Sequence, residues 1–163
     1  MLRKASIICL LLALLLSFSS CGGREIAPDK LLTDFCALYG SMPAGQVYTS
    51  GTPEWEEGHL SPALRDSLFL EDNGENAFSL CREYAIFLSS SFAGGEIAFL
   101  SCAGRADAVR VAEMCQARLL RVRQAVPGAP ILQQACVLRY DKTVVLLLLP
   151  DNERARAICD HLL

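Results

Sequence analysis

Histidine, tryptophan and basic residues are scarce in this chain. Its 163 residues include two histidines, one tryptophan and 15 basic residues against 18 acidic ones, with a net charge of −3. Without a basic excess to neutralise phosphates, a nucleic-acid binder of the usual kind is excluded. The chain also lacks a Gly-x-Ser-x-Gly elbow, a phosphate loop and a Cys-x-x-Cys pair. His59 and His161 stand beside no nucleophile or metal-ligand spacing, so we expect no catalytic residue, metal ligand or cofactor.

The first twenty residues have the pattern of an export signal. Arg3 and Lys4 precede an apolar run from Ile7 to Leu16, which covers about 15 Å, half of a bilayer core. Phe18-Ser19-Ser20-Cys21 then resembles a bacterial lipobox. We expect residues 1–20 to be a signal peptide and Cys21 to carry the acyl chains, palmitate among them, that anchor a lipoprotein at the extracytoplasmic face of the cell membrane. The alternative is a secretory signal with a coincidental cysteine.

Removing the signal leaves 13 basic and 18 acidic residues, a net charge of −5, so lipid and not surface charge should hold the protein to the membrane. Six cysteines remain besides Cys21, and six allow about 15 disulfide pairings. Each stands in an apolar pattern, where a free cysteine behaves as a small hydrophobe. We expect mostly reduced thiols in the core; one or two bridges are the alternative. The six are Cys36, Cys81, Cys102, Cys115, Cys136 and Cys159.

Hydrophobic periodicity predicts an α+β domain over residues 61–163, preceded by a lead (21–60) with the lipidated cysteine, a short helix and a loop. Residues 144–149 are all apolar, which indicates a central strand covered on both faces. Two hairpins, each followed by a helix, favour an antiparallel sheet of about four strands with helices packed on one face. Strands are expected at 83–89, 96–102, 132–140 and 143–149, with a further brief one at 46–49, and helices at 28–39, 61–68, 106–124 and 152–163. The longest helix should bury Val109, Ala112, Cys115, Leu119 and Val122.

Several segments of the second half of the chain form a recognisable set: Glu83-Tyr84-Ala85-Ile86-Phe87, Glu96-Ile97-Ala98-Phe99, the helix around residues 111–119, and residues 144–151 with the helix after them. With these segments the chain resembles DUF4358, a family of bacterial lipoproteins defined by a domain of unknown function. The similarity covers about half of the chain, and none of these motifs is catalytic. The resemblance therefore implies a fold and a cellular address but no chemistry.

Three functions fit these patterns. The first is a non-enzymatic binding or interaction module, whose partner is an envelope protein or a small ligand. The others are an accessory subunit of an envelope or transport complex and, less favoured, an unrecognised enzyme. The loop at 41–58 is the expected contact surface; it contains Glu54-Trp55-Glu56-Glu57, where a tucked-in tryptophan is the commoner arrangement. Arg118, Arg121 and Arg123 should form a solvated helix face.

Overall fold

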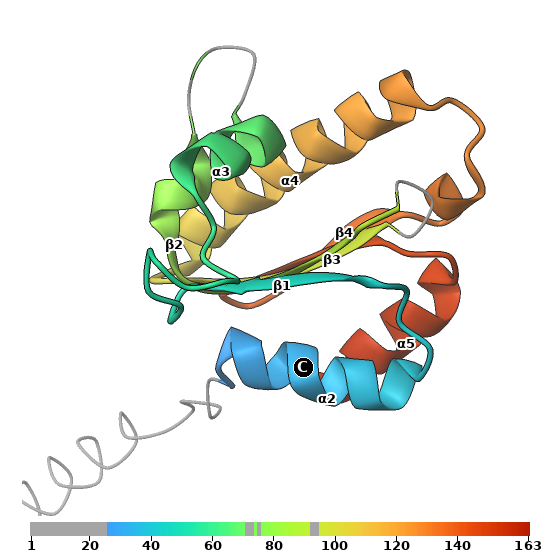
Figure 1. Cartoon of the computed structure of the whole chain (residues 1–163), viewed down its shortest axis with the longest axis horizontal. Coiled ribbons are helices and arrows are strands. Elements are labelled where there is room, and N and C mark those ends of the chain that lie inside the picture. Colours follow the sequence, from blue (N-terminus) through green and yellow to red (C-terminus); the bar gives the residue numbers. More distant parts are fainter. Residues whose placement is uncertain (1–25, 71–73, 75, 92–94) are drawn as a thin grey trace, which may run out of the picture.

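The computed structural model describes residues 26–163 apart from 71–73, 75 and 92–94, so the expected signal peptide and Cys21 lie outside the described residues. Figure 1 shows the arrangement of the elements. They are α2 (Pro28–Tyr39), β1 (Gly45–Thr49), α3 (Pro62–Phe69), η1 (Ala77–Leu80), β2 (Cys81–Ser89), β3 (Glu96–Cys102), α4 (Arg105–Ala125), η3 (Pro130–Leu132), β4 (Cys136–Tyr140), β5 (Thr143–Leu148) and α5 (Asn152–Leu162).

The strands form one sheet in the order β1-β2-β3-β5-β4, with antiparallel pairing throughout. This confirms the predicted α+β class. The expected count of about four strands was one too low, because β1 joins the edge of the sheet. It pairs with β2 from Gly45 opposite Ser89 to Thr49 opposite Ala85. Every residue of β5 is buried between β3 and β4, as the all-apolar run predicted.

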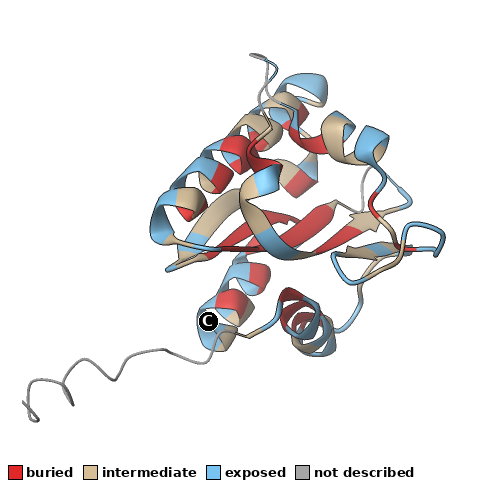
Figure 2. Cartoon of the chain, turned by 90° about the vertical axis from the view of Figure 1, so that its left-hand side faces the viewer, coloured by how far each residue is buried: buried red, intermediate tan, exposed pale blue. Residues whose placement is uncertain are grey.

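Helices cover both faces of the sheet, so the prediction that they pack on one face was wrong. The cartoon in Figure 1 places α3 and α4 on one side of the strands and α2 and α5 on the other. The reason lies in β2, whose alternate residues face two different cores. Ile86 joins the core under α4, whereas Ala85 and Phe87 join the core under α2 and α5. Figure 2 shows the resulting band of buried strand residues between two helical layers.

The segment from residue 28 to 60, expected as a lead into the domain, is packed within it. Leu31 and Phe35 of α2 have no exposed surface, and the Phe35 ring meets that of Phe99 edge-on, 5.9 Å between centroids. The Asp151 backbone N–H donates to the Tyr39 hydroxyl at 3.1 Å, which ties the end of α2 to the start of α5. The folded unit therefore includes α2 and β1.

The buried side of α4 is turned relative to the prediction. Cys115, Leu119 and Val122 are buried as expected, but Val109 is 40% exposed while Val111 and Met114 have no exposed surface. Val111 and Met114 lie on the side of the helix that packs on the sheet, and Val109 lies outside that side. Among the described residues, no helix is both long and apolar enough to cross a membrane.

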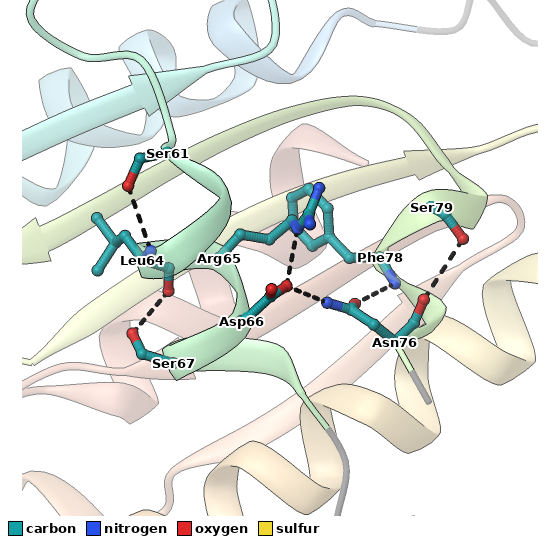
Figure 3. Close-up of polar contacts among 8 residues, drawn as sticks. All are labelled: Ser61, Leu64, Arg65, Asp66, Ser67, Asn76, Phe78 and Ser79. Carbon is teal, nitrogen blue, oxygen red and sulfur yellow. Dashed lines mark hydrogen bonds and ion pairs between the residues drawn. The ribbon is translucent and has the colours of Figure 1, made fainter. Parts of the chain in front are cut away.

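A polar cluster joins α3 to η1 and thereby fixes where β2 begins (Figure 3). The Asp66 carboxylate accepts hydrogen bonds from Arg65 Nε at 3.1 Å and from Asn76 Nδ2 at 2.9 Å. Asn76 Oδ1 in turn accepts the Phe78 backbone N–H at 2.9 Å, which caps η1. The backbone N–H of Cys81, the first residue of β2, donates to the Phe78 carbonyl.

Replacing Phe35 with alanine should lower the free energy of unfolding by about 3–5 kcal/mol, because a buried ring would leave a cavity between α2 and β3. Leu38→Ala is the matched control on the same helix, since Leu38 is 46% exposed. Urea denaturation of both variants measures the difference. Equal stability of Phe35→Ala and wild type would mean that α2 is not part of the cooperative fold.

Candidate contact loop

The loop from Ser50 to Gly58 follows the edge strand β1 and is attached to the neighbouring strand at its first residue. The Ser50 backbone N–H donates to the Tyr84 carbonyl at 3.1 Å, and the Tyr84 N–H donates to Ser50 Oγ at 3.2 Å. The Gly58 carbonyl accepts the Thr49 N–H at 3.2 Å, so the end of the loop returns to the strand that it left. Both ends of the loop are thus held by the sheet.

Hydrogen bonds within the loop fix its shape. The hydroxyls of Thr49 and Thr52 lie 2.9 Å apart, and His59 Nδ1 is 3.2 Å from the Thr52 carbonyl oxygen. The His59 backbone N–H also donates to the Glu56 carbonyl at 3.2 Å. His59 therefore holds the loop in place from its carboxyl-terminal side, while His161 is exposed in the last turn of α5.

The single tryptophan of the chain points away from the protein. Trp55 is 85% exposed, which overturns the expectation of a tucked-in side chain, and Glu54, Glu56 and Glu57 beside it are also exposed. Large aromatic side chains on ordered surfaces are enriched at the energetic centres of protein interfaces, because they bury much area at small conformational cost. The arrangement can contact a partner through an apolar ring surrounded by negative charge.

A hollow of about 200 Å³ lies between the start of this loop and the start of α2. Its lining includes Ala27 and Pro28 on one side, Ser50 and Gly51 on the other, and Tyr84 from β2. Because both segments line the hollow, the loop lies at the end of the molecule where the described chain begins, as Figure 1 also shows. Burial raises the pKa of the Tyr84 phenol, so its hydroxyl stays protonated.

Three of the five arginines of α4, Arg118, Arg121 and Arg123, bond to other parts of the protein. Of the three only Arg123 is exposed, so the expectation of a solvated face was wrong for Arg118 and Arg121. Arg118 forms an ion pair with Glu96 at 2.8 Å. Arg121 donates to the carbonyls of Leu68, at 2.7 Å, and Leu70 at the end of α3. Arg123 donates to the Ala135 carbonyl at 3.0 Å. These side chains fasten α4 to its neighbours, and an anion would have to displace such contacts.

The Glu96–Arg118 pair is a buried feature that the sequence pattern did not reveal. The Glu96 side chain is 5% exposed and that of Arg118 is 21% exposed, and both line a hollow of about 160 Å³ beside Val122 and Leu148. Removing the arginine would leave the buried Glu96 carboxylate without its cationic partner, which lowers the free energy of unfolding by about 3–5 kcal/mol. The sequence signal for this pair was Glu96, an acidic residue at the start of a mostly apolar strand.

The six expected core cysteines are unpaired in the structure, with Cys102, Cys115 and Cys159 buried and the other three half-buried. Burial raises the pKa of Cys159 to about 12 and raises the pKa of Cys115 as well, so both remain protonated thiols at neutral pH. In the part of the chain that the structure describes, no three histidine, cysteine or acidic side chains group as metal ligands.

No family model matches the chain, and no curated protein or solved structure matches it either. The resemblance to DUF4358 therefore stays an expectation from the sequence.

Replacing Gly58 with alanine should destabilise the loop, because Gly58 has φ of +94° and an added Cβ would lie 2.9 Å from the Val47 carbonyl oxygen. We expect a loss of about 1–3 kcal/mol of stability. Gly51→Ala in the same loop is the control, since no atom lies within 4 Å of its added Cβ. Urea denaturation followed by circular dichroism compares the two; equal curves would contradict this account of the loop.

Proposed function

We propose that this protein is a membrane-anchored bacterial lipoprotein that works without catalysis, binding a partner protein at the cell envelope through the loop from Ser50 to Gly58. The observation that carries the proposal is Trp55, 85% exposed on a loop whose backbone is fixed by its own hydrogen bonds. An ordered loop loses little conformational entropy on binding, so little of the free energy gained by burying the ring is offset by ordering the loop.

The charges around Trp55 indicate the chemistry of the partner. Glu54, Glu56 and Glu57 are exposed beside the ring, and a surface rich in lysine or arginine would complement them. Cationic side chains also interact favourably with the face of an indole ring. A basic protein surface with a shallow apolar depression therefore fits this loop best.

The expected lipid anchor places the loop close to the membrane. Only four residues lie between Cys21 and Ile26, the first described residue, and these five residue steps span at most about 18 Å. The loop lies at the same end of the fold as Ala27 and Pro28. This favours a membrane-associated partner, and it supports the second candidate function, an accessory subunit of an envelope or transport complex.

Two hollows of the described residues are too small for a drug-sized ligand. The one beside the loop measures about 200 Å³ and the one beside Glu96 about 160 Å³, whereas sites for drug-sized ligands usually enclose about 300–1,000 Å³. The Nδ1 atom of His59 lies 3.2 Å from the Thr52 carbonyl oxygen, within the loop itself. We favour a binding module over an unrecognised enzyme because the exposed ring of Trp55 offers a contact surface.

The anchor is tested by Cys21→Ser, which should move the protein from the membrane fraction to the soluble fraction of its producing cell, because the lipid attachment atom is lost. Immunoblotting of fractions after a carbonate wash measures the shift, and Cys36→Ser serves as the control. A Cys21→Ser protein that still sediments with washed membranes would contradict the lipoprotein assignment.

The contact surface is tested by Trp55→Ala in the membrane-anchored form. We expect a partner that cross-links to wild type in intact cells to be captured at least tenfold less, because the central apolar contact is gone. Leu120→Ala is the control, since Leu120 is 55% exposed but lies on α4, and it should retain the partner. Unchanged capture by Trp55→Ala, at unchanged thermal stability, would exclude this loop as the interface.

A further inference from the structure

Two of the six thiols lie opposite each other across neighbouring strands. Cys81, at the start of β2, is the direct partner of Cys102, at the end of β3, in the antiparallel ladder. Directly opposed residues in such a ladder have Cα atoms about 4.5–5.5 Å apart, and a disulfide needs about 4.4–6.8 Å. A directly opposed pair of this kind therefore falls within the Cα spacing that a disulfide needs.

A β-bulge places both side chains on the same face of the sheet. Along β2, Tyr84, Ile86 and Leu88 face the core under α4, so strict alternation would turn Cys81 to the opposite face. The register shifts between Cys81 and Glu83, which inserts one extra residue. As a result Cys81 packs against the same core cluster that contains Cys102.

The two thiols also interact directly. A side-chain hydrogen bond joins them; it lowers the pKa of Cys102 and raises that of Cys81. Cys102 has no exposed surface, whereas Cys81 is half-buried and can meet a reagent from solvent. Cys115 lies near both sulfurs but is fully buried on α4 and is not a strand partner.

We propose that Cys81 and Cys102, which face each other in the ladder, form a reversible disulfide. The oxidant is a second disulfide, of a small thiol or of a thiol oxidoreductase. The Cys81 sulfur attacks it, forming a mixed disulfide and releasing one thiolate, which takes the Cys81 proton. The Cys102 sulfur then attacks Cys81 Sγ, displacing the second thiolate, which takes the Cys102 proton; the protein loses two electrons and two thiols are formed.

The bridge would stabilise the end of the sheet that carries the contact loop. Cys81 opens the strand in which Tyr84 exchanges two hydrogen bonds with Ser50. Fixing the first residues of β2 against β3 restricts fraying of this strand end, so oxidation should protect the loop attachment. This chemistry depends on the geometry of the pair and is independent of the proposed partner binding.

The test uses the full chain, reduced and then equilibrated with mixtures of oxidised and reduced glutathione. Free thiols are alkylated in denaturant and the peptides are mapped by mass spectrometry. We expect one bridge, Cys81–Cys102, with Cys36, Cys115, Cys136 and Cys159 alkylated. A bridge between other cysteines, or alkylation of both Cys81 and Cys102 at the most oxidising ratio, would overturn the proposal.

Single substitutions distinguish a Cys81–Cys102 bridge from one that involves the nearby Cys115. Cys115→Ala should still form the bridge, because Cys115 is not part of it, whereas Cys81→Ser should form none even if Cys102→Ser fails to fold. The oxidised wild type should melt about 5 °C or more above its reduced form, and Cys81→Ser should show no such rise. An equal rise in Cys81→Ser would assign the stabilisation to another site and reject the pair.

Discussion

The fold depends on a sheet whose middle strands are apolar on both faces. Every residue of β3 and β5 is buried, and a strand of this kind is stable only if something covers each side. Two layers of helices meet that need, α3 and α4 above and α2 and α5 below (Figure 1). Helix α2 is therefore required by the sheet, because without it Phe99 would lose the ring of Phe35 that covers it.

The same constraint places the candidate interface at the edge of the sheet. Because β3 and β5 occupy the middle, β1 is left as an edge strand with one neighbour. The loop that follows it returns to β1 at Thr49 and is attached to β2 at Tyr84. A rigid scaffold with a braced loop at its edge is a common way to present binding residues. The buried Glu96–Arg118 pair fastens α4 to β3 and so supports that scaffold from within.

Much of this architecture was predictable from residue patterns. The period-two alternation of a strand accounts for the separation of Ile86 from Ala85 and Phe87 in β2, and the all-apolar run of β5 predicted a strand covered on both sides. Because β2 is apolar on both of its faces, its sequence already indicated a helical layer on each side of the sheet. The order of strands and helices along the chain instead suggested a single helical layer. The loop around Trp55 was predicted as the contact surface, yet whether its ring is exposed depends on contacts that sequence spacing does not encode.

The sequence by itself determined the class of the fold, the positions of its main helices and strands, and the burial of β5, because these follow from local periodicity. It also carries the export and lipidation pattern around Cys21. Tertiary structure alone decided which partners meet across the fold. Arg118 meets Glu96 because α4 crosses β3, and Cys81 meets Cys102 because a bulge reverses the alternation of β2. Such contacts join residues about twenty positions apart, and only the register of the strands and the docking of the helix bring them within reach.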